Sequence, residues 1–399
     1  MIPFVFLFLC VLPAIESAEE QLLFAQVLFR HGARAPSERF TNESFSQLFP
    51  RGLGELTDRG FENSYLLGKF LKKRYVDTGF LDSSMQPLQM YWRSVNKNRC
   101  LSTASTVGAA MFEHPDRHLH VAVYTEETAE NLLNYDIGNC VRETELVKEK
   151  CPGFTGVYDP WPKYEEFVAN CLNFTHPVLE KYPFHSLEAY LNEYKNGIPL
   201  PEPLAQNIDE ITKMYASVTQ WITGTGRYHD PRKMKIKFVN LMIVLLSNMK
   251  EFWTKVGSIS DAKQRELLLE SKRIPKFEVY STQDWMLMGV LEAFGVLEES
   301  VGLDAYPEYN SMIILELWEK DRKPFVKMYF KPEEKTEEDH NLIDLSNTIR
   351  ECPKDKSECP LKKFVSCCSE YIMALSCESA APQSNFVSPR RKKRFAGPE

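Results

Sequence analysis

The chain has 399 residues, of which 43% are hydrophobic and 26% are charged, and it carries a net charge of −7 at neutral pH. This composition is that of an ordinary globular protein, and the length allows one large domain or two smaller ones. The acidic balance argues against nucleic acid as a partner, because proteins that bind phosphate backbones usually carry an excess of basic residues.

The N-terminus has the pattern of a secretory signal peptide. Residues 2–13 are apolar without interruption but too few to span a bilayer, and the small residues Ser17 and Ala18 follow them. We therefore expect residues 1–18 to be removed, and a buried N-terminal strand is the alternative interpretation. The later apolar segment 238–249 is expected to be a core helix, so no stable membrane anchor is predicted.

Cysteine usage agrees with secretion. The sequence contains ten cysteines, and nine remain once Cys10 is removed with the signal peptide. Because nine is odd, at least one thiol is unpaired or bonds to another chain. The last five lie within residues 352–377, which predicts a disulfide-stapled segment in an oxidising compartment. The sequons at Asn42 and Asn173 are candidate glycosylation sites in a secreted chain.

The first 125 residues alternate between strand and helix patterns. Strand-like segments lie at residues 22–29, 88–94 and 118–125. Residues 56–79 predict a helix that Thr57 caps and Gly79 ends, and residues 99–112 predict a second helix, rich in small residues. The order β-α-β-α-β predicts an α/β fold with a doubly wound, mostly parallel sheet and helices on both of its faces.

The middle of the chain changes character. From about residue 126 to 270 the pattern is helical, which predicts an α-helical cap domain inserted into the sheet domain. Strand patterns then return at 276–282, 310–320 and 324–330, with a helix at 285–295. The expected division is an α/β core of residues 19–125 and 271–334, a cap of residues 126–270, and a Cys-rich tail of residues 335–399 that packs on the core.

Cations follow two of the predicted strands. Arg30, His31 and Arg34 come directly after the first strand, and Arg93 stands at the end of the second. In an open α/β sheet, ligands bind beyond the carboxyl ends of the strands, so neighbouring strand ends would bring these side chains into one pocket. Guanidinium groups suit a tetrahedral oxyanion such as phosphate, and His31 supplies a neutral nucleophile. The pattern therefore predicts phosphoryl transfer.

The segment LFRHGARAP, residues 28–36, resembles the RHGxRxP signature of the histidine acid phosphatases, which form branch 2 of the histidine phosphatase superfamily. Further segments resemble other blocks of that family: LTDRGFENSYLLGKFLKKRY (56–75), WRSVNKNRCLSTA (92–104) and CPLKKF (359–364). The resemblance covers residues 22–377. It is greatest for the prostatic, lysosomal and secreted or venom-type animal enzymes, rather than for phytases.

This resemblance implies roles for individual residues. His31 matches the nucleophile that forms a phosphohistidine intermediate. Arg30, Arg34 and Arg93 match the arginines that bind phosphate. Asp284 matches the acid that protonates the leaving group, and it can also cap the helix that starts there. The expected enzyme is an acid phosphatase that needs no metal or cofactor.

One position departs from the family pattern. The sequence reads YSTQDW at residues 280–285, so Gln283 stands where the family has a histidine that binds phosphate. A charged donor contributes about 1.5–3 kcal/mol and a neutral one about 0.5–1.5 kcal/mol. The difference corresponds to roughly a tenfold loss of rate. The sequence therefore predicts weakened catalysis, and the alternative is a secreted pseudoenzyme that binds phosphorylated ligands without turnover.

The resemblance also implies disulfides and partners. The family pattern suggests the disulfides Cys140–Cys377 and Cys352–Cys359, and Cys151–Cys171 is a further local pairing. The adjacent Cys367 and Cys368 are not expected to bond to each other. The expected ligand is a small phosphomonoester, with a homodimer as a further expectation. The expected destination is the outside of the cell, with the lysosomal lumen as the alternative.

Three other features have ordinary interpretations. His114, His118 and His120 lack Cys or Asp partners at ligand spacing, so surface or core histidines are favoured over a metal site. Cys100 is expected to be a buried thiol. The basic segment 390–394 is expected to be a solvated tail, rather than a processing site or a contact for a polyanion.

Overall fold

The computed structural model describes residues 20–41, 43–125, 132–133, 140–156, 161–332 and 341–372. Four features that the sequence singled out lie outside these residues: the signal peptide of residues 1–18, the sequon at Asn42, Cys377 and the basic segment 390–394.

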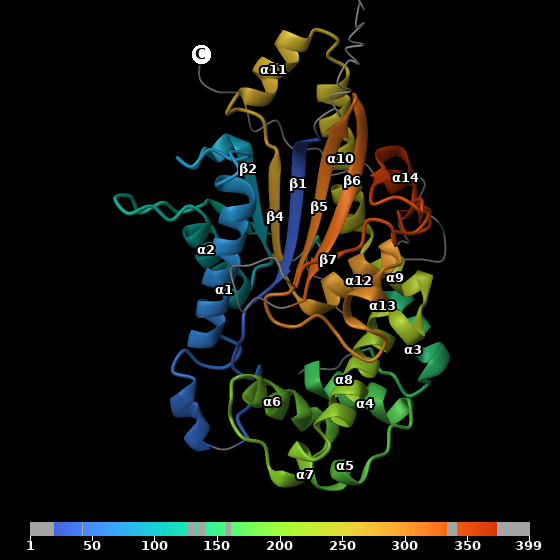
Figure 1. Cartoon of the computed structure of the whole chain (residues 1–399). Coiled ribbons are helices and arrows are strands. Elements are labelled where there is room, and N and C mark those ends of the chain that lie inside the picture. Colours follow the sequence, from blue (N-terminus) through green and yellow to red (C-terminus); the bar gives the residue numbers. More distant parts are fainter. Residues whose placement is uncertain are drawn as a thin grey trace, which may run out of the picture.

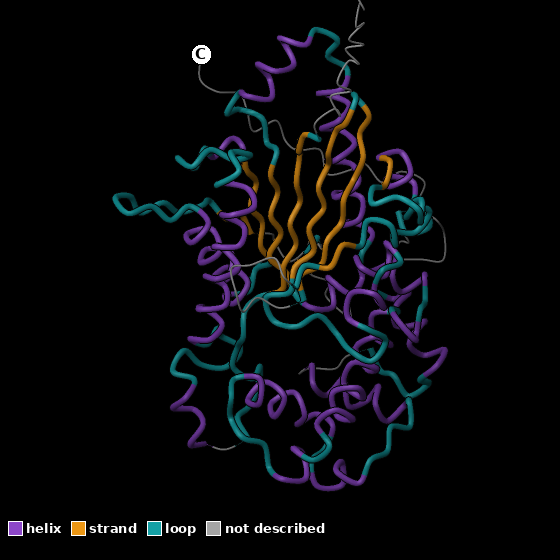
Figure 2. Tube along the Cα trace, viewed as in Figure 1, coloured by secondary structure: helices purple, strands orange, loops and turns teal. Residues whose placement is uncertain are grey.

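Within the described residues, eight strands form one sheet at the centre of the molecule (Figures 1 and 2). They are β1 (Gln21–Arg30), β2 (Met90–Ser94), β3 (Val123–Thr125), β4 (Phe277–Thr282), β5 (Met312–Lys320), β6 (Lys323–Lys331), β7 (Ile343–Asp344) and β8 (Cys359–Pro360). The path through the sheet is β3-β2-β4-β1-β5-β6-β7, and β8 pairs with β6. Strands β3, β2, β4 and β1 are mutually parallel, whereas the hairpin β5–β6 pairs antiparallel to β1. The predicted α/β class is confirmed.

The position of β4 differs from what chain order suggested. Phe277 of β4 is in register with Ala25 of β1 on one side and with Met90 of β2 on the other. The first two strands of the chain are therefore not neighbours. Every residue of β4 is buried, as expected for a strand with partners on both edges and helices on both faces.

Helices cover both faces of the sheet. On one face α1 (Asp58–Leu71) and α2 (Asn98–Met111) pack against the sheet through a shared apolar cluster, and Thr57 caps α1 as predicted by accepting a hydrogen bond from Gly60 N. The helix α1 continues into a wider turn, η2 (Lys72–Val76). On the opposite face lie α10 (Val239–Gly257), α12 (Asp284–Phe294), α13 (Leu297–Val301) and α14 (Leu361–Ser366).

Between β3 and β4 the chain forms helices and no strand in its described residues. They are α3 (Val141–Lys150), α4 (Trp161–Cys171), α5 (Pro177–Lys181), α6 (Phe184–Lys195), α7 (Glu202–Ala205), α8 (Ile208–Thr223), α9 (Pro231–Lys237), α10 and α11 (Ala262–Glu270). Helices α4 to α8 share an apolar cluster of their own, and Figure 1 shows them beyond the end of the sheet where β1 stops. Helix α10 instead packs on the sheet, although it lies within the range expected to form the cap.

The structure forms the disulfides Cys151–Cys171 and Cys352–Cys359. Cys140 is also disulfide-bonded, and its expected partner Cys377 lies outside the described residues. The structure closes no disulfide at the remaining described cysteines, which are all buried: Cys100, Cys367 and Cys368.

Candidate active site

The RHGARAP segment lies at the carboxyl edge of the parallel strands. Arg30 is the last residue of β1, and the backbone N–H of His31 donates to the carbonyl of Thr282 at the end of β4, at 3.1 Å. The backbone N–H of Asn310 donates to the carbonyl of His31 at 3.3 Å. The loop is therefore held between the end of β4 and the segment that precedes β5, which is the edge where α/β sheets bind ligands.

One hydrogen bond fixes the chemical form of His31. Its Nδ1 lies 2.9 Å from the carbonyl oxygen of Gly32. Because a carbonyl oxygen can only accept, Nδ1 must carry the hydrogen, which leaves Nε2 with its lone pair. The pKa of His31 is lowered well below 6.5, first by burial and then by the charges of Arg99, Arg30 and Arg34. A neutral imidazole with Nε2 as a nucleophile is thus maintained in mildly acidic solution.

Helices α1 and α2 contact the RHGARAP loop and fix its position. The backbone N–H of Gly32 donates to the Thr103 hydroxyl of α2 at 3.0 Å. A Cβ atom on Gly32 would lie 2.5 Å from the backbone oxygen of Gly60 in α1, and one on Gly60 would lie 2.1 Å from the backbone oxygen of Ala33. Glycine at positions 32 and 60 therefore lets the loop and α1 approach closely, and this contact places His31.

The third arginine near His31 is Arg99, and the sequence had assigned that place to Arg93. Arg99 is in the first turn of α2. Among the neighbouring charges, that of Arg99 lowers the pKa of His31 the most. Arg30 is in register with Thr282 of β4, whereas Arg93 is in register with Tyr280. At about 3.3 Å per residue, the backbone of Arg93 lies about 7 Å farther from the carboxyl edge.

Each of the three arginines has a buried donor that is available for a ligand. The Nε–H groups of Arg30, Arg34 and Arg99 are buried and have no hydrogen-bond partner among the residues that the structure describes. Buried donors are nearly always paired in proteins, because an unpaired one costs about 1–3 kcal/mol. An oxyanion with several acceptor oxygens would satisfy these donors.

The end of β4 and the start of α12 contribute Gln283 and Asp284. A carboxylate oxygen of Asp284 lies 2.8 Å from Nη2 of Arg30. The amide oxygen of Gln283 accepts a hydrogen bond from Nη2 of Arg99 at 3.0 Å. Gln283, not Asp284, is the N-cap of α12, and Asp284 is the first helical residue, where the helix dipole favours a carboxylate. The side chain of Gln283 therefore orients an arginine, an interaction that the sequence alone did not indicate.

The guanidinium of Arg30 is fixed on three sides. Its Nη1 donates to the backbone oxygen of Pro307 at 2.7 Å, and its central carbon lies 4.2 Å from the ring centre of Tyr309. The ring of Tyr306 is 5.6 Å from the same carbon, and Lys195 of α6 donates to the Tyr306 hydroxyl. Aromatic rings stabilise a buried cation through their negative faces. They therefore help to keep Arg30 charged where little water can reach it.

Two side chains of α6 and the side chain of its C-cap residue also contact the loop or the tyrosine beside it. Glu188 accepts a hydrogen bond from Nη1 of Arg34 at 2.8 Å, and Asn192 accepts one from the hydroxyl of Tyr309. Asn196 donates to the backbone oxygen of Arg34 at 2.9 Å. These residues are spaced by four, so they lie on one face of the helix. The sequence analysis missed them, although the spacing Glu-x₃-Asn-x₃-Asn in a predicted helix was a signal for such a polar face.

The inserted helical region also places a buried acid near the site. Glu165 of α4 is buried, and its pKa is raised to about 8, first by burial and in part by the charges of Glu188 and Asp284. A carboxyl group with this pKa is protonated in acidic solution. Glu165 therefore adds no negative charge to the site under those conditions.

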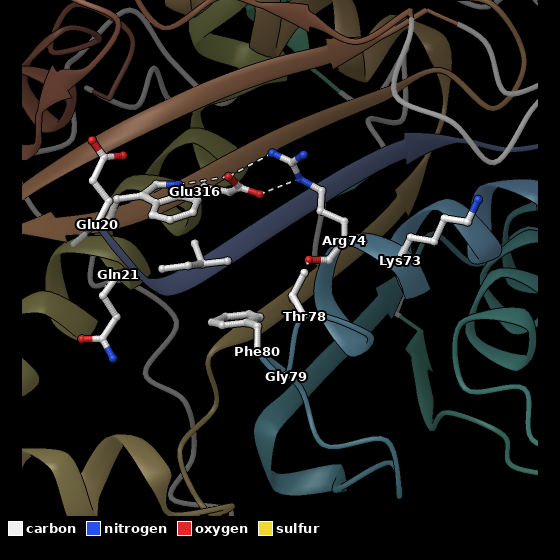
Figure 3. Close-up of a pocket in the computed structure, with 10 residues that line it drawn as sticks. Glu20, Gln21, Lys73, Arg74, Thr78, Gly79, Phe80 and Glu316 are labelled. Carbon is white, nitrogen blue, oxygen red and sulfur yellow. Dashed lines mark hydrogen bonds and ion pairs between the residues drawn. The ribbon is translucent and has the colours of Figure 1, made fainter.

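A pocket of about 730 Å³ lies elsewhere, at the amino end of β1 (Figure 3). The carboxylate of Glu316 is at its centre. It accepts hydrogen bonds from Arg74 at 2.8 Å, from Tyr75 at 2.7 Å and from Trp318 at 3.0 Å. These side chains therefore form hydrogen bonds with one another. None of the predicted site residues lines this pocket, so it is not the phosphate site.

In the described ranges, no group of three or more His, Cys, Asp or Glu side chains has the arrangement of a metal site. The same ranges contain no helix that is both long and apolar enough to cross a membrane.

The match to a family model covers residues 21–331 and identifies the histidine phosphatase superfamily (branch 2). The chain belongs to this superfamily. It is 30% identical to the Caenorhabditis briggsae protein named "Putative acid phosphatase 1", over 90% of this chain and 82% of that one. It is 26% identical to the prostatic acid phosphatase of Rattus norvegicus, over 84% of this chain and 85% of that one.

The fold is also similar to that of solved bacterial structures. A phytase of Hafnia alvei in complex with tartrate aligns with a TM-score of 0.55 over 88% of this chain and 97% of that one. The identity is 14%, so this likeness concerns the fold alone.

The contact between Glu188 and Arg34 leads to a prediction. The substitution Glu188→Gln keeps the shape of the side chain but removes its charge, so Arg34 loses its partner and its fixed orientation. We expect the KM for p-nitrophenyl phosphate to rise about tenfold. The matched control is Glu166→Gln in α4, whose carboxylate pairs with His185. An equal effect of both substitutions on KM would contradict a positioning role for Glu188.

Proposed function

We propose that the protein is an acid phosphatase that hydrolyses phosphate monoesters through a phosphohistidine intermediate. The observation that carries this proposal is a neutral, buried His31 whose Nε2 is free of a proton and whose charged neighbours are three arginines. Membership of the histidine phosphatase superfamily and relatives named as acid phosphatases support it. The substrate is a small phosphomonoester.

The reaction has two steps. Nε2 of His31 attacks phosphorus, the bond from phosphorus to the leaving oxygen breaks, and Asp284 gives its proton to that oxygen. Water then attacks phosphorus, the bond from phosphorus to Nε2 of His31 breaks, and Asp284 takes a proton from the attacking water. This step releases phosphate and restores both His31 and the protonated Asp284. Arg30, Arg34 and Arg99 stabilise the charge that develops on the phosphoryl oxygens.

Arg30 links substrate binding to the proton donor. In this structure Arg30 is paired with Asp284. A phosphate dianion competes for the same guanidinium, so its binding would release Asp284 toward the leaving group. This exchange supports the assignment of Asp284 as the general acid.

We assign the third phosphate-binding arginine to Arg99 rather than to Arg93. The support is the strong effect of Arg99 on the pKa of His31, the largest of any neighbouring charge, and the hydrogen bond of Arg99 to Gln283. The role of Gln283 is then to orient Arg99. A neutral amide replaces a charged donor, which supports reduced turnover relative to enzymes that have histidine there.

Gln283 also supports a second candidate function. A site that keeps its arginines but lacks the second histidine can bind phosphate without rapid turnover, as in a secreted phosphatase-like pseudoenzyme. Secretion, with the lysosomal lumen as the alternative, glycosylation and a homodimer remain part of the proposal. Asn173 is exposed in the turn that follows α4, where a glycan can be accommodated.

The assignment of Arg99 leads to a prediction about rate. With p-nitrophenyl phosphate at about pH 5, where an acid phosphatase is active, we expect His31→Ala to abolish product release. Arg99→Gln should lower kcat/KM about 100-fold or more, as loss of a transition-state donor does, and Arg93→Gln should lower it far less. A larger loss for Arg93→Gln than for Arg99→Gln would contradict the assignment.

The lowered pKa of His31 leads to a prediction about pH. His31 must be unprotonated to attack, and its pKa lies well below 6.5, so the nucleophile is lost only when the pH falls through that lowered value. We expect the acid limb of kcat/KM to lie well below pH 6.5. In Arg99→Gln the acid limb should move to higher pH, because the variant lacks the charge that opposes protonation of His31 most strongly. The pH dependence of kcat/KM for one substrate in both proteins measures this shift, and an unmoved limb would count against it.

The substitution Gln283→His tests the two candidate functions. If a charged donor is what the site lacks, the variant should hydrolyse p-nitrophenyl phosphate about tenfold faster than the natural protein in acidic solution. A fall or no change would contradict the role given to Gln283. Phosphate binding with no product release by the natural protein would favour the pseudoenzyme.

A further inference from the structure

Two adjacent cysteines lie in the core, far along the chain from the active site. Cys367 and Cys368 directly follow α14, and both are buried. Their Sγ atoms are 2.6 Å apart, and Sγ of Cys368 lies 3.3 Å from the backbone oxygen of Ala293 in the last turn of α12. Next to them the rings of Phe294 and Phe364 stack with their centres 5.0 Å apart.

We propose that Cys367 and Cys368 are joined by a disulfide between neighbouring residues, within the segment that packs on the end of α12. Non-bonded atoms of this size pack at roughly 3.5 Å or more. A separation of 2.6 Å between the two sulfurs therefore favours a bond between them over two independent thiols. This differs from the expectation that the sequence alone gave.

Of the described cysteines, only Cys100, Cys367 and Cys368 lie outside the disulfides that the structure forms. Cys151–Cys171 and Cys352–Cys359 are closed disulfides, and Cys140 is also bonded. Cys100 is on α2, where its sulfur faces the backbone oxygen of Thr282 at 3.7 Å. A bond between Cys367 and Cys368 would leave Cys100 as the single thiol of the described residues. Together with the expected Cys140–Cys377 pairing, this would account for the odd number of cysteines after removal of Cys10.

The chemistry needs an oxidant, and a small disulfide of the secretory compartment supplies it. One thiolate attacks this disulfide and forms a mixed disulfide with release of one small thiol. The second cysteine then attacks the protein sulfur of the mixed disulfide and releases the second small thiol. In total, two protein thiols are oxidised to one disulfide and one small disulfide is reduced to two thiols.

The timing follows from burial. The pKa of Cys368 is raised well above 9.0, first by burial and then by its contact with Cys367. Once the segment is packed, the reactive thiolate is therefore suppressed and an oxidant cannot reach it. The bond must form before the segment docks on α12, and after docking it is protected from reduction.

The test uses the secreted full-length protein. The protein is denatured without reducing agent, and its thiols are alkylated and counted by mass spectrometry. We expect one label, on Cys100, whereas a reduced pair would give three. Cleavage after Lys363 and Tyr371 should release the peptide 364–371, unlabelled and lighter by two hydrogens than its dithiol form.

Variants separate the proposal from a failure to oxidise in general. Cys367→Ser should expose Cys368 and give two labels, while the double variant Cys367→Ser/Cys368→Ser should again give one. A labelled pair in the natural protein, together with closed Cys151–Cys171 and Cys352–Cys359, would overturn the proposal. A peptide that links Cys367 or Cys368 to Cys140 or Cys377 would also overturn it.

Discussion

The site depends on the hydrogen bond from Nδ1 of His31 to the carbonyl oxygen of Gly32. This bond selects the tautomer and directs Nε2 away from the loop, so the nucleophile is set before any ligand arrives. Its geometry requires the backbone of Gly32 to lie against Gly60 of α1 and to donate to Thr103 of α2. The two helices on one face of the sheet therefore fix the chemistry at its edge.

Charge balance is the second requirement of the site. Three guanidinium groups are buried together, which would be unfavourable without partners. Asp284 pairs with Arg30, Glu188 pairs with Arg34, and the amide oxygen of Gln283 faces Arg99. One of these partners comes from the cap helix α6 and two come from the start of α12, directly after β4. The phosphate site is thus built jointly by the sheet and the inserted helices, and a change in the cap is expected to act on the loop as well.

The sequence predicted the elements and the centre of the site, but not the connections between them. The strands near residues 22–29 and 276–282 and the helices that begin at Thr57 and Asp284 were visible because hydrophobic period and capping are local signals. The place of β4 between β1 and β2 was not visible, because pairing between distant segments leaves no local pattern. That gap explains why the sequence analysis placed Arg93 in the site: the position of each strand residue relative to the carboxyl edge follows from strand register. The partners on α6 have a local signal in their spacing of four residues, but their contact with the loop joins distant segments and leaves no such pattern.

The central place of β4 has a consequence for synthesis of the chain. His31 is made early and Asp284 is made 253 positions later, the difference between the two numbers. Strand β4 lies between β1 and β2 and pairs with both. Until Thr282 has left the ribosome, β1 and β2 therefore lack the strand that joins them into one sheet. The nascent chain must therefore keep its first apolar strands apart from other chains while the whole helical insertion is made, and contacts this distant in sequence form slowly. The protein is expected to need chaperone protection during translation, and no product that ends before β4 can have the site.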